Sequence, residues 1–448
     1  MSETVEEFAG SLGGQLLRPG DDGYEESRRV FNAMIDKQPA MILRCAGASD
    51  VMKGIDFARE QGLVVSVRGG GHSIAGNAVC DGGLMLDLST MKGMRVDPGR
   101  RTARAQPGLK LGEFDRETQG FGLATTLGIA TDTGIAGLTL GGGIGWLNGK
   151  YGLACDNLVS ADVVTADGRF LTVSATENED LFWAIRGGSG NFGVVVSFEY
   201  QLHPLGQVLA GAVLHPFEQA TEVLRFYHEF ASGCPDELST IGALLPAPDG
   251  TPVVGIAVCY CGSLEDGEEV VQPLRSFGSP IMDFIGPMDY VDVQSMFDDW
   301  FPPGRQHYWK SNFLSELTDT SIETLVEYMA RKPSQATFTY LQQMHGAASR
   351  VPATDTAFPH RQEHYDLGIL SQWDSPADTE ENIRWTREFW EAMQPHVEEG
   401  VYVNNLGEEG QERVEAAYGP NYERLVELKN KYDPTNLFSN NQNIKPTS

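Results

Sequence analysis

The stretch Val67-Arg68-Gly69-Gly70-Gly71-His72-Ser73-Ile74-Ala75-Gly76 tells more about this chain than any other segment. It follows an apolar run at residues 63–67, which predicts a buried strand. Glycine lets backbone amides turn inward and approach a ligand closely, and successive amides in such a turn form an anion-binding nest. A nest with His72 at its edge predicts a nucleotide-type cofactor whose reactive ring lies beside the imidazole. A glycine-rich turn with a surface histidine is the alternative.

The surroundings of this stretch indicate an α/β arrangement. Residues 50–60 have apolar positions at helical spacing and lead directly into the predicted strand. The glycine turn then lies at the carboxyl end of a strand, where ligands commonly bind in α/β sheets. From about residue 205 to 400 the glycine clusters nearly disappear, and long helical candidates alternate with strand-like runs. This change predicts a separate α+β domain that shapes a pocket.

Composition excludes several classes of function. A chain of 448 residues is long enough for two or three domains. Its net charge of −29 disfavours binding to nucleic acid or to anionic membranes. No run of about 18 apolar residues predicts a membrane helix, and the acidic start lacks the features of a signal peptide, so we expect a cytoplasmic protein. The six scattered cysteines predict free thiols and no metal site.

A second glycine cluster, residues 133–146 (TGIAGLTLGGGIGW), extends the interpretation. It lacks the Gly-Lys-Ser/Thr ending of a phosphate-binding ATPase loop, and it is not the strand–GxGxxG–helix unit of nicotinamide-binding folds. Two separate glycine clusters suggest one extended ligand that lies between two backbone clefts. FAD would fit, with its pyrophosphate on the amides and its ring near His72.

Four motifs in order carry a family resemblance. They are residues 68–76, residues 133–146, residues 150–157 (KYGLACDN) and residues 432–438 (YDPTNLF). Together they closely resemble the FAD-linked oxidases of the vanillyl-alcohol-oxidase (PCMH-type) fold, in the berberine-bridge-enzyme branch, from about residue 30 to 445. The resemblance implies a two-domain α+β fold. We expect an FAD-binding domain at 1–205, a substrate domain at 206–410 and a C-terminal segment, 411–448, that returns to the FAD domain.

The resemblance also implies how the cofactor is held. His72 matches the histidine that bonds covalently to the 8α-methyl of the flavin. Many relatives add a link through a cysteine, but the matching position here is Ala130 and Cys155 lies past the block, so one covalent bond is expected. The other residues expected to bind FAD are Arg68, Gly69, Gly70, Gly71, Ser73, Gly76, Leu127, Gly128, Thr131, Gly134, Gly137, Gly142, Gly145, Tyr151, Asn157, Val164, Asn441 and Asn443.

The catalytic base is where the sequence departs from the family pattern. Many relatives end a Tyr-x-Asn-Tyr segment with a catalytic tyrosine, whereas residues 402–405 read Tyr-Val-Asn-Asn. Asn405 cannot act as a base and can only orient substrate through hydrogen bonds. Tyr402 is one candidate base, provided that its pKa is lowered. An amine substrate bound in its neutral form, which needs no base, is the other interpretation.

A strand at residues 337–345 offers a further candidate. Alternation places Thr339, Leu341, Gln343 and His345 on one face, which by resemblance forms the floor of the substrate pocket. We expect His345 to be the leading candidate base, with a structural histidine as the alternative. Gln343 is expected to contact substrate.

The expected reaction follows from the resemblance. A hydride passes from a carbon of an alcohol, sugar or amine to flavin N5, and O2 reoxidises the flavin to give H2O2. Thr133 lies where relatives control the access of oxygen, and a residue of this size favours an oxidase. The alternatives are a dehydrogenase with another acceptor, a monooxygenase that uses a flavin–oxygen adduct, and a non-catalytic ligand-binding protein. The sequence leaves the substrate and the oligomeric state open.

Overall fold

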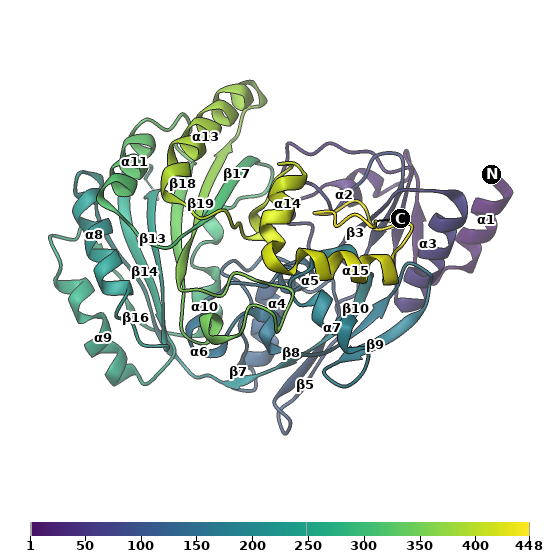
Figure 1. Ribbon diagram of the computed structural model, residues 1–448, viewed down its shortest axis with the longest axis horizontal. Helices are drawn as coiled ribbons and strands as arrows, with labels where there is room; N and C mark the ends of the chain where they lie inside the picture. Colours follow the sequence, from purple (N-terminus) through teal and green to yellow (C-terminus); the bar gives the residue numbers. More distant parts are fainter. Residues whose placement is uncertain (1, 248, 448) are drawn as a thin grey trace.

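The computed structural model describes residues 2–247 and 249–447. Figure 1 shows two lobes side by side along the long axis of the molecule. The first half of the chain builds one lobe, the middle of the chain builds the other, and the two last helices run back over the first lobe. We call them the N-terminal lobe and the central lobe.

A four-stranded sheet in the N-terminal lobe carries the first glycine cluster. Its order is β1 (Gln15–Leu17), β2 (Met41–Arg44), β4 (Leu84–Asp87) and β3 (Val65–Arg68). β4 pairs in parallel with β2 and β3, while β1 is antiparallel. Helix α3 (Ala48–Gln61) packs Val51, Ile55 and Ala58 against the buried side chains of β2 and β4. β3 ends at Arg68, so Gly69 lies at the carboxyl end of this strand.

A five-stranded antiparallel sheet completes this lobe. Its order is β5 (Met94–Asp97), β6 (Thr102–Ala105), β10 (Val194–Gln201), β8 (Leu158–Val164) and β9 (Phe170–Ser174). Its accompanying elements are α4 (Leu111–Gln119), α5 (Ile135–Leu140), α6 (Asn148–Tyr151), the 3-10 turn η1 (Ala154–Asn157), α7 (Glu179–Ile185) and a small pair made of β7 (Leu123–Ala124) and β11 (His203–Pro204). α1 (Ser2–Ser11) and α2 (Tyr24–Arg28) lie near the beginning of the chain.

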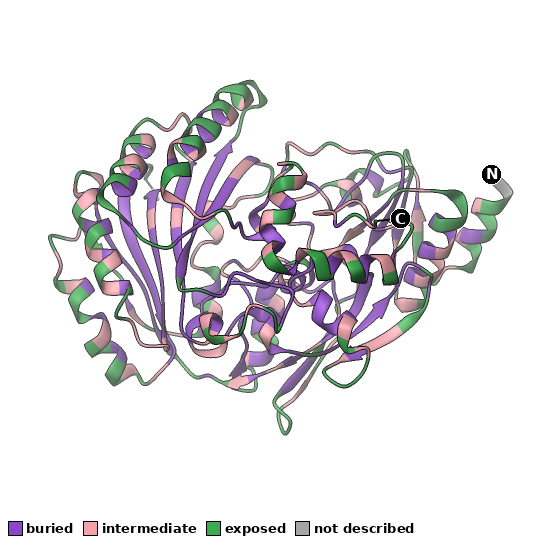
Figure 2. Ribbon diagram, in the orientation of Figure 1, coloured by how far each residue is buried: buried purple, intermediate pink, exposed green. Residues whose placement is uncertain are grey.

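The central lobe is one antiparallel sheet with helices on one face. Its order is β15 (Met282–Asp283), β12 (Val208–Pro216), β14 (Pro252–Tyr260), β13 (Leu238–Pro246), β18 (Phe338–Met344), β19 (His364–Trp373) and β17 (Gln306–Leu314), with β16 (Gly286–Met288) beside β12. The covering helices are α8 (Ala220–Ala231), α9 (Leu264–Ser276), α11 (Asp319–Ala330) and α13 (Thr379–Met393). Figure 2 shows that the strands are buried while these helices expose their outer sides. The opposite face of the sheet meets the N-terminal lobe.

A buried ion pair holds the end of the chain in place. Helices α14 (Gln411–Tyr418) and α15 (Tyr422–Tyr432) precede it. Lys429 Nζ lies 2.7 Å from Asp433 Oδ2, and neither side chain is exposed. Lys429 also donates to the carbonyls of Asn191 and Phe438, while Asp433 accepts from the amides of Leu437 and Phe438. A buried pair is tolerated when its remaining donors and acceptors are satisfied. The Tyr-Asp-Pro motif therefore folds the last residues onto the N-terminal lobe.

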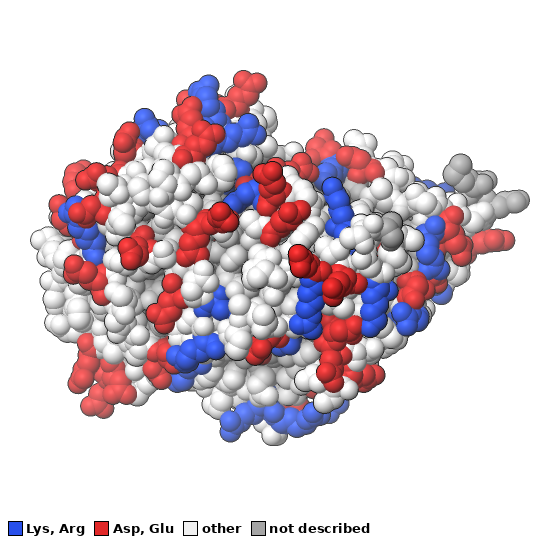
Figure 3. Space-filling view, viewed as in Figure 1, with Lys and Arg blue, Asp and Glu red and all other residues white. Residues whose placement is uncertain are grey.

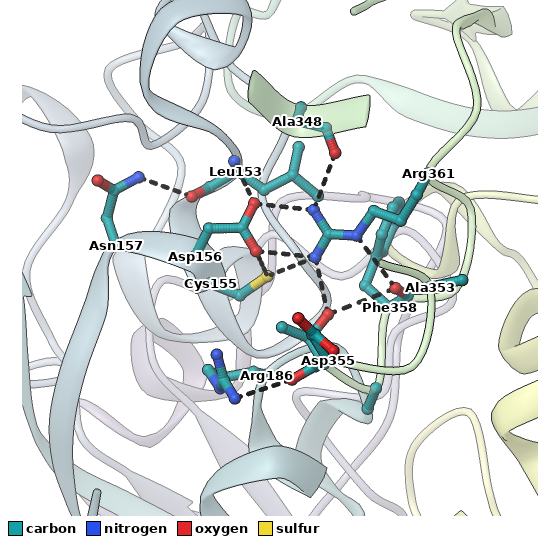
Figure 4. Close-up of polar contacts among 12 residues, drawn as sticks. Leu153, Cys155, Asp156, Asn157, Arg186, Ala348, Ala353, Asp355, Phe358 and Arg361 are labelled. Atoms are coloured by element: carbon teal, nitrogen blue, oxygen red, sulfur yellow. Dashed lines mark hydrogen bonds and ion pairs between the residues drawn. The ribbon is translucent and has the colours of Figure 1, made fainter. Parts of the chain in front are cut away.

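A second buried pair joins the two lobes, as Figure 4 shows. Arg361, on the loop between α12 (Ala347–Arg350) and β19, reaches Asp156 of η1 with two hydrogen bonds of 2.8 Å. It also donates to Thr356 Oγ1 and to the carbonyls of Ala348 and Phe358. A bidentate arginine–carboxylate pair fixes orientation as well as distance. The pair therefore sets how the N-terminal lobe meets the central lobe.

Figure 3 shows Asp and Glu side chains scattered over both lobes of this face, with Lys and Arg side chains between them and a group of Lys and Arg along its lower rim. Of the helices that the structure describes, none combines the length and hydrophobicity that a membrane crossing needs. The six cysteines are not joined in disulfides, and Cys155 is buried.

A buried carboxylate between the lobes predicts a pH-dependent stability. Asp115 of α4 is fully buried, accepts a hydrogen bond from Gln294 on α10 (Tyr290–Ser295), and burial raises its pKa to about 7. In the unfolded chain this carboxyl group loses its proton near pH 4. The free energy of unfolding therefore falls between about pH 4 and pH 7, and it does not recover above pH 7. Asp115→Asn should therefore stabilise the protein increasingly over this range, by up to about 4 kcal/mol.

Thermal unfolding of the wild type and of Asp115→Asn between pH 4.5 and 8 measures this effect. Asp22→Asn, at an exposed position, is the matched control and should follow the wild type at every pH. A stability difference for Asp115→Asn that is the same at all pH values would contradict the account.

Candidate active site

The two glycine clusters meet backbone to backbone. A Cβ atom added to Gly70 would lie 2.5 Å from both N and Cα of Gly134, and one added to Gly134 would lie 2.5 Å from N of Gly70. Real Cβ atoms do not approach other atoms so closely, so both positions require glycine. Gly71, with φ of 73°, turns the chain through the left-handed region immediately afterwards. The contact forms one wall of a cavity.

This cavity lies where the two lobes face each other. The N-terminal lobe contributes residues 69–73, 128–130, 133–134, 136–138, 189–190 and 193–195, and the end of the chain adds residues 440–442. The central lobe contributes side chains from β17, β18 and β19, and the turn η7 (Val403–Asn405) closes one side. Much of the N-terminal wall is bare backbone, which suits a ligand that is held by amides.

His72 lies on this wall with its ring beside that of Phe31. The ring centroids are 3.8 Å apart and the planes differ by 18°. Burial lowers the pKa of His72 to about 4, so the imidazole is neutral near pH 7. A neutral imidazole has a free nitrogen lone pair and can act as a nucleophile.

The residues present fit an extended, phosphate-bearing flavin. At Gly137 and Gly190 a Cβ atom would meet nothing within 4 Å among the described residues, so the walls leave open space. Asn441 donates to the carbonyls of Gly190 and Phe438, while its buried Oδ1 has no hydrogen-bond partner in the described part of the chain. A buried unpaired acceptor is costly unless a ligand satisfies it. The glycine-lined walls, the unpaired Oδ1 of Asn441 and the neutral imidazole of His72 together fit FAD.

Many residues that the sequence singled out do line the cavity. They are Gly69, Gly70, Gly71, His72, Ser73, Gly128, Ala130, Thr133, Gly134, Gly137, Tyr402, Asn405 and Asn441.

Other residues expected to bind FAD do not line the cavity. Arg68 donates to the carbonyl of Ser27. Thr131 donates through its amide and its hydroxyl to Asp298 of the central lobe. Tyr151 stacks on His203 at 3.9 Å. The remaining members of this group are Gly76, Leu127, Gly142, Gly145, Asn157, Val164 and Asn443, which also do not line the cavity. Sequence motifs do not separate residues that shape a turn from residues that face the ligand.

The expected face of the strand at residues 337–345 was wrong. Gln343 accepts from Thr240 Oγ1 at 2.9 Å and donates to the carbonyl of Ala231 at 2.7 Å, on the side covered by α8. The His345 ring is 2.9 Å from the carbonyl oxygen of Leu238. Neither residue lines the cavity. The alternation itself was correct, but both faces of this sheet are buried, so periodicity did not tell which one faces the ligand.

Tyr402 lines the cavity but does not meet the condition for a base. Its hydroxyl accepts hydrogen bonds from the amides of Gly143 and Ile144 and from Nδ2 of Asn404. Burial raises the pKa of Tyr402 above its usual value. The lowered pKa that this candidate required is therefore contradicted.

A carboxylate that the sequence analysis missed faces the cavity instead. Asp366 of β19 accepts from Ser311 Oγ on Oδ1, and from Tyr340 OH and Asn405 Nδ2 on Oδ2, each at 2.9 Å. Burial raises the pKa of Asp366 to about 6, although the three hydrogen bonds oppose this shift. Tyr340, Asp366 and Asn405 all line the cavity. We call Ser311, Tyr340, Asp366 and Asn405 the Asp366 cluster.

Signals for these groups were present in the sequence. Asp366 is the single acid in the strand Tyr365-Asp366-Leu367-Gly368-Ile369-Leu370, where an acid in an apolar run marks a buried polar site. Tyr340 lies on the other face of the strand predicted at residues 337–345. A third glycine cluster, residues 187–193, supplies part of the wall.

The rest of the central-lobe wall is largely aromatic and apolar, formed by Phe301, Trp309 and Leu370. Among the residues that the structure describes, no lysine or arginine lines the cavity, and Asp366 is the only acid. Such a wall is suited to an uncharged or cationic substrate and not to an anion.

Comparisons with known proteins agree with this geometry. Residues 39–174 match the family described as FAD binding domain, and residues 401–445 match berberine and berberine like. The chain is 34% identical to an FAD-linked oxidoreductase of Dictyostelium discoideum, covering 99% of this chain and 97% of the relative. It is 31% identical to (R)-6-hydroxynicotine oxidase of Paenarthrobacter nicotinovorans, covering 97% of each.

Solved structures agree as well. The 6-hydroxy-D-nicotine oxidase of Arthrobacter nicotinovorans is similar with a TM-score of 0.88 at 30% identity, over 97% of this chain and 98% of that one. A chitooligosaccharide oxidase is similar with a TM-score of 0.87 at 25% identity, over 99% and 100%.

The glycine contact generates a direct prediction. Gly134→Ala places a methyl group where the backbone of Gly70 lies, so the two segments must separate. We expect the purified variant to contain less than about a tenth of the wild-type flavin, because a displacement of an ångström loses the amide contacts of a preorganised site. Flavin absorbance relative to protein measures this.

Gly47→Ala is the matched control for that variant, because Gly47 has extended backbone and an added Cβ there meets no described atom within 4 Å. It should bind flavin like the wild type. Full flavin content in Gly134→Ala would show that the contact is not needed.

Proposed function

The chain belongs to the FAD-linked oxidoreductases of the berberine-bridge-enzyme-like family, and on this premise we propose that it is an oxidase of a small molecule. Its substrate carries the reacting C–H bond on a carbon that bears a hydroxyl or an amino group. Bound FAD supplies the hydride acceptor and passes the electrons to O2, which gives H2O2. The single observation that carries this proposal is the Asp366 cluster in the wall of the cavity that also contains His72.

The N-terminal lobe would hold the cofactor. The backbone of residues 69–73, the open space beside Gly190 and the unpaired Oδ1 of Asn441 supply the contacts. We propose that His72 forms the single covalent bond to the flavin. Its low pKa supports this role, and Ala130 offers no sulfur for a second bond.

The Asp366 cluster would accept the proton that leaves the substrate. The Tyr340 hydroxyl already donates to Asp366 Oδ2 at 2.9 Å. It can therefore accept the proton of the substrate hydroxyl or amine while its own proton moves to the carboxylate. This route needs no phenolate, which matters because burial holds the pKa of Tyr340 well above its usual value. Asn405 donates to both Tyr340 and Asp366 and fixes their relative position.

The substrate would be an uncharged or cationic compound. Relatives are named for oxidising 6-hydroxynicotine and chitooligosaccharides, which represent an amine and a sugar. The aromatic side chains of Phe301 and Trp309 can pack against a ring of either class. A screen of cyclic amines, secondary alcohols and sugars, measured by peroxide release, identifies compounds for the experiments below.

Replacing the carboxylate tests the proton route. Asp366→Asn should lower the rate of anaerobic flavin reduction by about 10²- to 10⁴-fold, the usual contribution of a positioned acid–base group. In the wild type, this rate should fall as the pH drops through about 6, because a protonated Asp366 cannot take the proton from Tyr340. The variant should lack this pH dependence. Stopped-flow absorbance measures the rate of flavin reduction in the wild type and in the variant at each pH.

Asp374→Asn makes the same chemical change just after the end of β19 at an exposed carboxylate, and should keep the wild-type rate and pH profile. If Asp366→Asn reduces its flavin at the wild-type rate, another group takes the proton.

The reaction with oxygen has its own test, which requires no substrate. Thr133 lines the cavity beside Ala130, and a larger aliphatic side chain there would occupy space on the path of O2. With flavin reduced by light, we expect Thr133→Leu to react with O2 roughly tenfold more slowly or worse. Thr133→Ser is the control and should react like the wild type. A wild-type protein whose reduced flavin survives in air for minutes would contradict the assignment as an oxidase.

A further inference from the structure

His72, beside which the cofactor is proposed to bind, is part of an aromatic stack. Phe31 lies between two imidazoles, with its ring centroid 3.8 Å from that of His72 and 4.4 Å from that of His307. The interplanar angles are 18° and 24°, so the three rings are nearly parallel. Phe31 is not among the described residues that line the cavity, whereas His72 is. Phe31 therefore acts on the cavity through its neighbours. The ring of His72 is the nearest of them, and the cavity-lining rings of Trp309 and Phe301 lie 6.0 and 6.3 Å from Phe31 between centroids.

The loop that carries Phe31 is fixed on both sides. The Phe31 amide donates to the carbonyl of Gly71 at 3.0 Å, next to His72. The buried Asn32 donates to the carbonyl of Ile74 at 2.9 Å and to the carbonyl of His307 at 2.9 Å. It also accepts from the His307 amide at 3.0 Å. This one side chain thus ties the His72 turn to β17 of the central lobe. The backbone of Phe31 cannot move away from the His72 turn without breaking these bonds.

The stack carries no charge at neutral pH. Burial lowers the pKa of His307 to about 3 and that of His72 to about 4. Neither ring nitrogen of His307 has a hydrogen-bond partner among the described residues. His307 therefore supplies a flat, neutral surface behind Phe31 and exchanges no proton with His72.

We propose that Phe31 is a positioning residue for the attachment of the flavin to His72. Stacking fixes the plane of the imidazole, so that one nitrogen stays directed at the cofactor; this inference rests on the covalent bond proposed above. The bond joins that nitrogen to the 8α carbon of the flavin. The two electrons of the broken C–H bond reduce the flavin ring system, which also takes up the proton from that bond and the proton from the imidazole N–H. O2 then reoxidises the flavin. A fixed ring raises the rate because less orientational freedom is lost at the bond-forming step.

The experiment measures the attachment reaction directly. The full-length protein without flavin is produced in riboflavin-limited cells and mixed with saturating FAD. Samples are taken over time and stopped in denaturant, and in-gel flavin fluorescence measures the flavin that is covalently attached. Phe31→Ala should attach flavin about tenfold more slowly than the wild type, and Phe31→Leu similarly, because leucine fills space without offering a ring face. Phe31→Tyr keeps the ring and should restore a rate within about twofold of the wild type.

Phe57→Leu is the matched control, since it breaks a stacked pair, with Phe8 at 4.0 Å, elsewhere in the same lobe. Its attachment rate should equal that of the wild type. Quenching of FAD fluorescence on non-covalent binding and the thermal midpoint show that each variant folds and binds FAD, and Phe31→Leu decides the question if Phe31→Ala does not fold.

The outcomes separate this inference from the proposed function. If the wild type attaches flavin, His72→Ala does not, and the Phe31 variants attach it at the wild-type rate, the role of Phe31 is wrong while the proposed attachment stands. If the wild type releases all of its flavin on denaturation, the covalent bond and the role of Phe31 are both wrong. Slow attachment in both Phe31→Ala and Phe31→Leu with recovery in Phe31→Tyr supports the inference.

Discussion

The site depends on the contact between Gly70 and Gly134, where two segments that are 64 residues apart meet without side chains. Because a single methyl group at either position would lie 2.5 Å from the opposite backbone, the two glycine clusters are required by each other and not only by a ligand. Their contact lies next to His72, which is part of the cavity wall. The central lobe then faces this wall with Asp366, so the group proposed to hold the cofactor and the group proposed to take the proton belong to different lobes.

Two buried ion pairs keep this arrangement from opening. Arg361 and Asp156 connect the lobes through a bidentate contact, and Lys429 with Asp433 folds the end of the chain onto the cavity. Removing one partner of such a pair would leave a buried charge without compensation, which typically costs about 3–5 kcal/mol. Both carboxylates lie in motifs that carry the family resemblance, residues 150–157 and 432–438. In the structure, these two carboxylates hold the walls of the cavity together.

Sequence predicted the fold far better than the details of the site. Family motifs identified the fold class, and the glycine clusters identified segments that line the cavity, because bare backbone in such a wall demands glycine. The division into domains at 205 and 410 stays a prediction, as does the role of each site residue. His345 was misplaced because both faces of its strand are buried. Tyr402 does line the cavity, but its full burial, which raises its pKa, follows from tertiary packing that the motif does not show. Asp366 was missed because its partners lie on three separate elements, which only folding brings together.

The central claim is that this backbone contact holds a flavin against His72, and peptide mapping tests it most directly. Trypsin should release residues 69–92 as one peptide, since Arg68 precedes it and Lys92 ends it. Mass spectrometry of the denatured, digested protein should find one FAD on this peptide, with fragmentation that places it on His72. Flavin that is released completely on denaturation, or that is found on another peptide, would contradict the account.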